Sequence, residues 1–200
     1  MRENRTSGSV RGALGNRRSY REMPFKMNMR DDKIVNQFVE SAKNYCSILE
    51  TDPEDPEIWL EDILKSLSCL YAFAHILPEY DFQEELYEED AFDVTNDEIR
   101  ELMSKLMNIL KDQNWYWAYF DPSEPNDSRD KPVRGNIYRD IKPGLKAWDT
   151  NDDSLLPEII FDWKFPLFGS HWGVHAVSAM RALHPICYLR GLHNNNKNKA

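Results

Sequence analysis

Apolar residues recur every three or four positions in the part of the chain that follows Asp31, which is the spacing of one face of an α-helix. The positions of this stripe are Ile34, Val35, Phe38, Val39, Ala42, Tyr45, Cys46 and Leu49. The pattern predicts an amphipathic helix that ends near Glu50, where the polar, proline-containing residues 51–56 follow.

Two local signals set the starts of the next helices. Asp55 followed by Pro56 combines a side-chain acceptor at the N-cap with a proline at the first helical position, and the apolar positions beyond them predict a central helix over residues 57–76. Thr95 and Glu98 are spaced as a capping box, in which each side chain accepts a hydrogen bond from the other residue's backbone N–H. A third helix is therefore expected to start at Thr95.

Further helical stripes occupy residues 136–142, 155–165 and 172–189. Pro143 is expected to interrupt the first of them because its ring opposes a straight helix, and Pro166 with Gly169 separates the other two. No segment sustains an alternation of apolar and polar residues, so no sheet is expected. The predicted fold class is all-α, a single helical bundle of about six helices.

The net charge of −9 is unevenly distributed. The first 26 residues carry seven arginines and lysines against two glutamates, a net charge of +5, which leaves −14 for the rest. This basic segment has too few apolar residues to offset the entropy of ordering it. Met27 and Met29 precede the first helix, so the arm also fits a wrong choice of start. We expect three segments: a disordered basic arm over residues 1–28, a single helical domain over residues 29–192 and a disordered tail over residues 193–200.

Composition argues against several classes of protein. No stretch reaches the roughly 18 consecutive apolar residues of a membrane helix, and the N-terminus lacks the apolar run of a secretory signal. We therefore expect a cytoplasmic protein without membrane contact. Its acidic body repels nucleic acid, so nucleic-acid binding is not expected. Cys46, Cys69 and Cys187 lack the spacing of a zinc or redox pair and are expected to be buried free thiols.

His171 and His175 form the most informative pair in the sequence. Four residues apart on a helix, they share one face and could both reach one metal ion as neutral imidazoles. Trp172 occupies the place where a metalloprotease has its catalytic glutamate, so that mechanism is not supported. A third ligand would come from another helix, and we expect no other cofactor. The candidate ligands are Asp140, Glu158 and Asp162.

Arg181 and His184 lie three residues apart on the same helical stretch, at the edge of an apolar stripe. The pair suits a bound anion, and it also suits an arginine that compensates a core carboxylate such as Asp140 and fixes one helix against another. Alanines recur every three positions here and permit close helix packing, which favours the second alternative. They are Ala176, Ala179 and Ala182. A structural polar network, a small-anion pocket and a metal site all stay open.

An acidic run lies between the second and third predicted helices, in what we expect to be a connecting loop. Its residues are Glu84, Glu85, Glu88, Glu89 and Asp90. Acidic side chains gathered in one loop can attract a basic partner. This run is therefore the candidate surface for a protein partner.

Two segments carry a family resemblance: Ile137-Tyr-Arg-Asp-Ile-Lys142, and residues 168–184 with the patterns His-Trp-Gly-x-His-Ala and Ala-x-Arg-Ala-Leu-His. They resemble the bacterial family of domains of unknown function numbered 5063. Residues 34–46 with Leu49 and Glu50 resemble its beginning, so the resemblance spans roughly residues 30–190. It implies a small, mainly helical bacterial protein without an assigned activity. The candidate polar cluster is Tyr138, Arg139, Asp140, His171, Trp172, His175, Arg181 and His184.

The sequence thus predicts an accessory or partner-binding protein without catalysis. Its acidic body, aromatic content and small size also fit an immunity protein that neutralises a toxin. The alternative is a metal- or anion-dependent hydrolase or transferase. Its site would use His171, His175, Arg181 and His184 with Asp140 as the carboxylate.

Overall fold

The computed structural model describes residues 29–80, 92–111, 116–118, 128–130 and 135–188. The expected arm (residues 1–28), the expected tail (residues 193–200) and the acidic run at residues 84–90 lie outside the described residues. The division into one domain over residues 29–192 stays a prediction.

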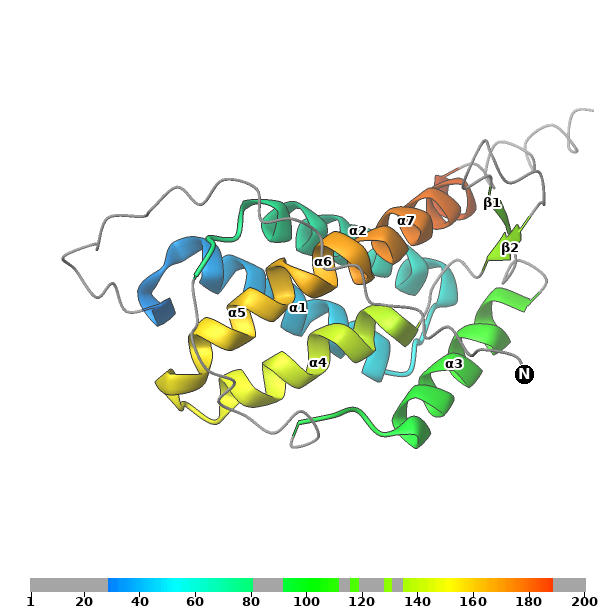
Figure 1. Ribbon diagram of the computed structural model, residues 1–200. Helices are drawn as coiled ribbons and strands as arrows, with labels where there is room; N and C mark the ends of the chain where they lie inside the picture. The colour runs from blue at the N-terminus through cyan, green and yellow to red at the C-terminus, as the bar shows by residue number, and fades with distance from the viewer. Residues whose placement is uncertain (1–28, 81–91, 112–115, 119–127, 131–134, 189–200) are drawn as a thin grey trace, which may run out of the picture.

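Seven α-helices make up most of the described chain, as the apolar stripes predict (Figure 1). They are α1 (Lys33–Glu50), α2 (Pro56–Ile76), α3 (Asn96–Leu110), α4 (Gly135–Asp149), α5 (Leu156–Lys164), α6 (Pro166–Ser170) and α7 (Trp172–Tyr188). Single 3-10 turns, η1 (Met29–Asp31) and η3 (Asp153–Leu155), precede α1 and α5. The prediction of an all-α helical bundle is confirmed. The five-residue α6 was not predicted as a separate helix.

A small two-stranded ribbon corrects the expectation that there is no sheet. Strand β1 (Tyr116–Ala118) pairs antiparallel with β2 (Ser128–Asp130), so that Tyr116 lies opposite Asp130. Each strand has three residues, and period-two alternation can be recognised only over about four residues or more. The sequence pattern therefore could not reveal the ribbon.

The first three long helices begin where the sequence places side-chain caps. Asp32 caps α1 and Asp55 caps α2, each by accepting hydrogen bonds from two backbone N–H groups of the first turn. The capping box of α3 is confirmed: the Thr95 N–H donates to Glu98 Oε2 at 2.7 Å, and the Glu98 N–H donates to the Thr95 hydroxyl at 3.2 Å. These bonds satisfy N–H groups that have no partner inside the helix.

Helix α4 runs without interruption through Pro143, so the predicted break at this residue is wrong. A proline costs a helix interior about 3 kcal/mol, and packing on both sides of the proline offsets this cost. Ile141 and Leu145 are buried, and Trp163 Nε1 of α5 donates to the Ile141 carbonyl at 3.3 Å. Gly144 leaves room for that indole, since a Cβ there would lie 2.5 Å from Trp163 Nε1.

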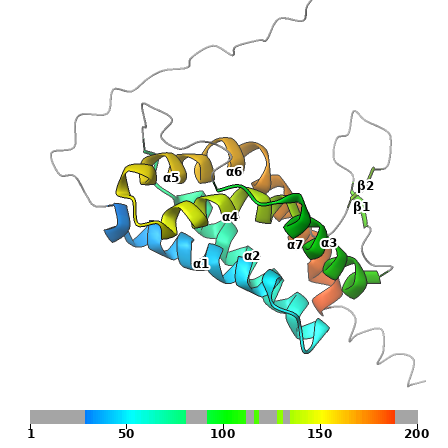
Figure 2. The ribbon, with the colours of Figure 1, turned by 90° about the horizontal axis from the view of Figure 1, so that it is seen from below.

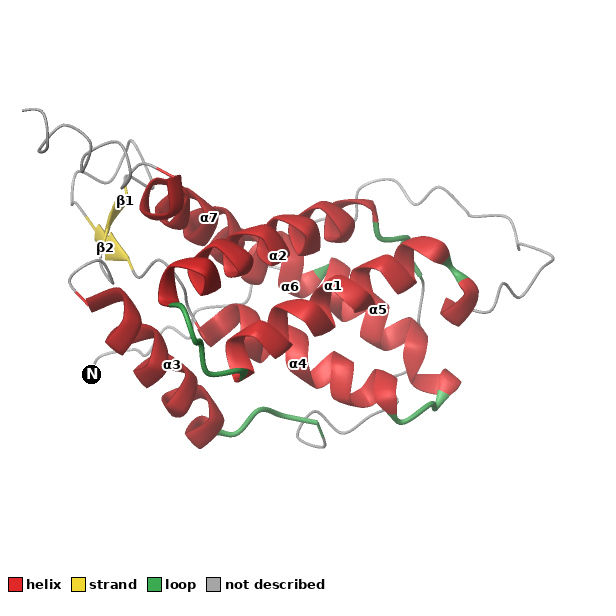
Figure 3. Cartoon of the chain, turned by 180° about the vertical axis from the view of Figure 1, so that it is seen from behind, coloured by secondary structure: helices red, strands yellow, loops and turns green. Residues whose placement is uncertain are grey.

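The core lies between the α1–α2 hairpin and the C-terminal helices (Figures 2 and 3). Phe38 of α1 lies 4.9 Å from Trp163 and 6.4 Å from Trp172 between ring centroids, so α1, α5 and α7 meet at one aromatic cluster. The alanine stripe of α7 is buried, and α7 packs against α2, which fits the close helix packing expected of this stripe. Helix α4 packs against α1, α3, α5 and α7. This central position lets α4 contribute to two separate polar sites.

The three cysteines differ in exposure. Cys46 is buried, Cys69 is exposed and Cys187 is half-buried, so the prediction of buried thiols holds for Cys46 only. Leu67 and Leu70 occupy the inner face of α2 around Cys69, which leaves the thiol on the outer face. None of the described helices is long and apolar enough to cross a membrane.

Candidate functional site

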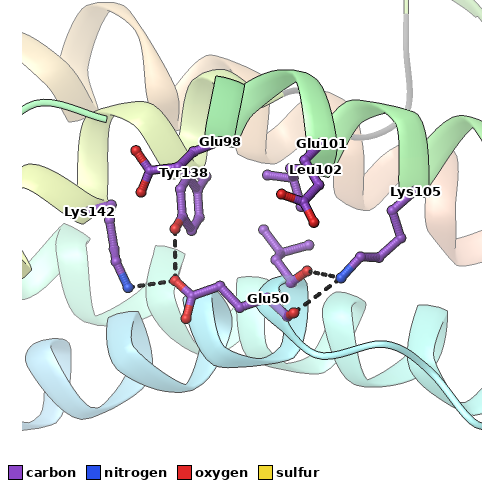
Figure 4. A pocket seen from close by; sticks show the side chains of 8 residues that line it. Glu50, Glu98, Glu101, Leu102, Lys105, Tyr138 and Lys142 are labelled. Carbon is purple, nitrogen blue, oxygen red and sulfur yellow. Dashed lines mark hydrogen bonds and ion pairs between the residues drawn. The ribbon is translucent and has the colours of Figure 1, made fainter. Parts of the chain in front are cut away.

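Helix α4 presents polar side chains to two different neighbours. Tyr138 and Lys142 are four residues apart and point toward the end of α1 (Figure 4). Asn136 and Asp140 are also four apart and meet the start of α7. Residues four apart share one helical face, and a shift of two residues rotates a side chain by about 200°. One short segment of helix therefore serves two sites.

The first site is a ladder of Asn136, Asp140, His171 and His175, which we call the histidine ladder. Asp140 Oδ2 contacts His171 Nδ1, and the Asn136 amide nitrogen lies 3.2 Å from His175 Nε2. The two imidazole rings are 4.9 Å apart between centroids and stand at 81° to each other. The two contacts join α4 to His171, the residue between α6 and α7, and to His175 in the first turn of α7.

The two members of the Asp140–His171 pair lie in different environments. The Asp140 side chain is 9 % exposed, whereas that of His171 is 44 % exposed. Burial raises the pKa of Asp140, and the hydrogen bond and charge of His171 lower it by less. A buried carboxylate that holds one imidazole nitrogen leaves the other nitrogen as the group able to exchange a proton or bind a metal.

Two further members of the predicted cluster have structural partners. Trp172 is buried, and its Nε1 donates to the Trp163 carbonyl at 3.2 Å. Arg139 is exposed, and its Nη2 donates to Asn96 Oδ1 of α3 at 3.0 Å. Neither side chain contributes to the histidine ladder.

Arg181 and His184 lie apart from the ladder on the exposed face of α7. His184 is nine residues beyond His175, about 13 Å along the helix axis and on the opposite side. Its ring contacts Tyr188 instead, with 5.0 Å between centroids. Asp140 pairs with His171 and forms no salt bridge with Arg181 within the part of the chain that the structure describes. The eight residues of the predicted polar cluster therefore do not form a single site in the structure.

Metal binding at His171 and His175 stays a prediction. Among the described residues, no three histidine, cysteine, aspartate or glutamate side chains come together as a metal-binding group. Of the carboxylates considered as a third ligand, Asp140 contacts His171, and Glu158 is buried in α5.

The second site is a pocket of about 350 Å³ between the end of α1, α3 and α4, which we call the α1–α3–α4 pocket (Figure 4). Its lining residues are Leu49, Glu50, Glu98, Glu101, Leu102, Lys105, Tyr138 and Lys142. Leu49 and Leu102 are buried and supply its apolar part. The other six combine three carboxylates, two ammonium groups and one phenol.

Glu50 is the centre of the hydrogen bonding in this pocket. Its Oε1 accepts from the Tyr138 hydroxyl at 2.7 Å and from Lys142 Nζ at 2.5 Å. Burial, followed by the bond to Glu50, raises the pKa of Tyr138. Burial likewise raises the pKa of the neighbouring Cys46 thiol to about 12. Both groups therefore stay protonated at neutral pH.

Lys105 of α3 caps the C-terminal end of α1. Its Nζ donates to the backbone carbonyls of Leu49 and Glu50 at 3.1 Å and of Thr51 at 3.2 Å, and it lies 3.1 Å from Asp52 Oδ1. Carbonyls at a helix C-terminus lack N–H partners and carry a partial negative charge. The ammonium group of Lys105 donates hydrogen bonds to these carbonyls and offsets their partial negative charge.

The two glutamates of α3 differ in how they are paired. The Thr95 backbone N–H and hydroxyl lower the pKa of Glu98, whose Oε1 lies 3.7 Å from Lys146 Nζ. Glu101 is exposed and has no hydrogen bond or ion pair with any residue that the structure describes. One carboxylate of the pocket is therefore available to a ligand.

Sequence reasoning found Tyr138 and missed most of its surroundings. Lys142 had a detectable signal, because it stands four residues after Tyr138 and so shares its face. Asn136 stands in the same way four residues before Asp140. Glu50 and Glu101 had no such signal, since separate helices bring them to the pocket.

Comparisons with known proteins agree with this architecture. The sequence model of a family described as "Domain of unknown function (DUF5063)" matches residues 30–189. The crystal structure of protein BF1032 from Bacteroides fragilis is similar, with a TM-score of 0.68 and 26 % sequence identity over 78 % of this chain and 94 % of that chain. No curated protein matches the chain.

Proposed function

The chain belongs to the DUF5063 family of domains of unknown function, and we propose that it is an accessory protein that binds a basic protein partner through the α1–α3–α4 pocket. The observation that carries the proposal is Glu101, a carboxylate without a hydrogen bond or ion pair to any described residue, beside a cavity of about 350 Å³. A cavity of this size suits one long side chain or a small ligand.

The charges of the pocket favour a cationic ligand. Lys142 is paired with Glu50, and Lys105 is paired with Asp52 and the α1 carbonyls. A bound cation would therefore meet Glu101 without having to displace either lysine. Buried Leu49 and Leu102 would pack against the apolar stem of the same side chain.

The protonation of the pocket's neighbours supports binding rather than covalent chemistry. A nucleophile works as its deprotonated form or beside a base that deprotonates it. The raised pKa of Tyr138 keeps its phenol as a hydrogen-bond donor to Glu50, and the raised pKa of Cys46 keeps the buried thiol uncharged. Neither group is therefore activated as a nucleophile.

An immunity protein that neutralises a toxin is the accessory class that we propose within this function. Such proteins present acidic and aromatic side chains to a basic partner. Beyond the first 26 residues this chain carries a net charge of −14, to which the acidic run at residues 84–90 contributes. A cytoplasmic location and a bacterial source belong to the same proposal.

A titration of the full chain with a basic peptide tests the proposed function. The probe is a short glycine-rich peptide with two arginines and two lysines, and the control peptide has glutamine at those four positions. We expect the basic peptide alone to shift NMR resonances at the end of α1 and in α3 and α4. We expect the shifts to weaken with added salt.

Matched variants make the test specific to the pocket. Glu101→Gln removes the unpaired carboxylate, and Glu40→Gln removes an equal charge from an exposed position of α1, ten residues before Glu50. Weaker binding in Glu101→Gln alone supports the proposal. Equal shifts with both peptides, or equal loss in both variants, would overturn it.

The histidine ladder favours a second candidate function, acid–base catalysis by a hydrolase or transferase. Its support is the half-exposed His171 held at Nδ1 by the buried Asp140, the relation found in catalytic histidine–aspartate pairs. Elemental analysis of untagged protein tests the metal-dependent form. A stoichiometric metal that is lost in a His171→Ala, His175→Ala double variant would support catalysis over simple partner binding.

A further inference from the structure

We propose that the outer face of α7 is a docking surface for a helix of another protein, one that carries a carboxylate among its apolar side chains. No residue of α7 lines the α1–α3–α4 pocket, so the proposal goes beyond the proposed function and does not depend on it. Three observations carry it: a stripe of exposed side chains, the environment of the arginine inside that stripe, and the poor fit of a second copy of this chain.

The outer stripe of α7 consists of exposed residues that recur at intervals of three, four, three and four positions. They are Val174, Val177, Arg181, His184 and Tyr188. This is the spacing with which one helix meets another along a coiled-coil seam. Val174 is 37 % exposed, and Val177 and Tyr188 are each 47 % exposed. Apolar side chains that share an exposed face mark a contact surface, whereas scattered ones do not.

Arg181 is the middle residue of the outer stripe. It has no hydrogen bond or ion pair with any residue that the structure describes. Helix α7 contains no aspartate or glutamate, and on the neighbouring α2 the Glu61 carboxylate lies 2.9 Å from Lys65 Nζ. A purely apolar partner would take the guanidinium out of water without pairing it, which is costly. A partner that covers the stripe therefore has to bring a carboxylate to Arg181.

A second copy of this chain fits the outer stripe poorly. Arg181 lies seven residues after Val174 and seven before Tyr188. Antiparallel pairing of two stripes over their full length therefore sets Arg181 opposite Arg181, and parallel pairing in register does the same. Like charges that face each other across a contact repel, and two chains of net charge −9 repel as well. The occupant is therefore a different chain, with a carboxylate where a second copy would bring a guanidinium.

A designed helical peptide tests the surface on the full chain. The probe has leucine at successive a and d positions and one glutamate at its central a position, and two otherwise identical control peptides carry glutamine or lysine there. NMR titration, below the concentration at which the peptides self-associate, gives each Kd from the resonances of α7. We expect the glutamate peptide to bind about fivefold more tightly than the glutamine peptide, as for a favourable surface ion pair, and the lysine peptide to bind least. Equal binding of all three would overturn the proposal.

A charge reversal identifies the contact. Arg181 is exposed, so Arg181→Glu should fold, which its circular dichroism spectrum would check. We expect this variant to bind the lysine peptide more tightly than the glutamate peptide. Arg100→Glu is the matched control, because Arg100 is an exposed arginine of α3 that pairs with Asp97 at 2.6 Å. It should keep the wild-type order. The wild-type order in Arg181→Glu would overturn the proposal.

The apolar part of the outer stripe has its own test. Val177→Ser should weaken binding of the glutamate peptide about fourfold, since it removes apolar surface from the contact. Met107→Ser of α3 is the control, because Met107 is 46 % exposed and Val177 is 47 % exposed, and it should leave the Kd unchanged. Analytical ultracentrifugation of the chain alone should find a monomer. A dimer that Val177→Ser dissociates would overturn the proposal in favour of a second copy.

Discussion

Two polar sites flank the same short segment of helix α4. They differ in whether their side chains already have hydrogen-bond partners. In the histidine ladder, Asp140 is buried against His171, and Asn136 meets His175. In the α1–α3–α4 pocket, Glu50 accepts two hydrogen bonds, whereas Glu101 has no partner among the described residues and lies beside a cavity. The ladder joins helices, whereas the pocket leaves room for another molecule.

The comparison shows why residue type alone is a poor guide to function. Histidine and aspartate are the usual candidates for chemistry, and in this fold Asp140 and His171 also connect α4 to the start of α7. Glutamate is usually a solvated surface residue, but here it lines the described cavity beside a tyrosine. A polar side chain is informative about ligands when the fold leaves it unpaired next to a space.

The largest expected effect tests whether both sites depend on one placement of α4. Gly144→Ala would put a Cβ 2.5 Å from Trp163 Nε1, and overpacking of this kind costs about 3 kcal/mol. Chemical denaturation should show this loss, and the NMR resonances of both sites should shift. Gly169→Ala is the matched control, because nothing lies within 4 Å of its new Cβ. A Gly144→Ala protein as stable as wild type would contradict the packing of α4 on α5.

The next prediction breaks the histidine ladder. His171→Ala leaves the Asp140 carboxylate desolvated without its partner, which should lower the unfolding free energy by about 2 kcal/mol. His184→Ala removes an exposed histidine of α7 and should change the unfolding free energy by less than about 0.5 kcal/mol. Equal effects in the two variants would show that the Asp140–His171 contact contributes nothing.

Much of the fold could be predicted because it depends on local signals. The stripe from Ile34 to Leu49 and the caps Asp55 and Thr95 placed three helices to within a few residues. The error at Pro143 arose because tertiary packing, here with Trp163, overrides a local preference. Propensity and pattern cannot report a contact between α4 and α5.

The candidate sites show the same limit more sharply. The four-residue spacing of His171 and His175 correctly placed both side chains near each other. The Glu50–Lys142 pair joins residues 92 positions apart, and no periodicity connects them. The pocket exists only where three helices converge, so its unpaired carboxylate could be recognised only in the folded structure.

A third prediction separates stability from binding within the pocket. Tyr138→Phe removes the hydroxyl that donates to Glu50 and should cost about 1 kcal/mol, while the Glu101 carboxylate stays. Glu101→Gln should change the unfolding free energy by less than about 0.5 kcal/mol and weaken binding of the basic peptide. Denaturation and NMR titration of both variants check this. The contrast fails if Tyr138→Phe loses binding or if Glu101→Gln loses stability.

The smallest expected effect is a dependence on pH that has opposite signs at the two sites. Burial raises the pKa of Asp140, so the folded chain holds this proton at a pH where the unfolded chain has released it. The stability from Asp140 is fully present below its unfolded pKa and is lost as the pH rises through the folded pKa. Wild type should therefore gain stability relative to Asp140→Asn as the pH falls from 7 to 4.

Glu98 in the pocket should behave in the opposite way. The Thr95 backbone N–H lowers its pKa, so its stability is present above the unfolded pKa and is lost as the pH falls through the folded pKa. Wild type should therefore lose stability relative to Glu98→Gln over the same interval. Urea denaturation of the three proteins at several pH values checks both signs. The two differences in unfolding free energy, wild type against Asp140→Asn and wild type against Glu98→Gln, should therefore change in opposite directions with pH. A change in the same direction would show that the ladder and the pocket do not hold their carboxylates in different environments.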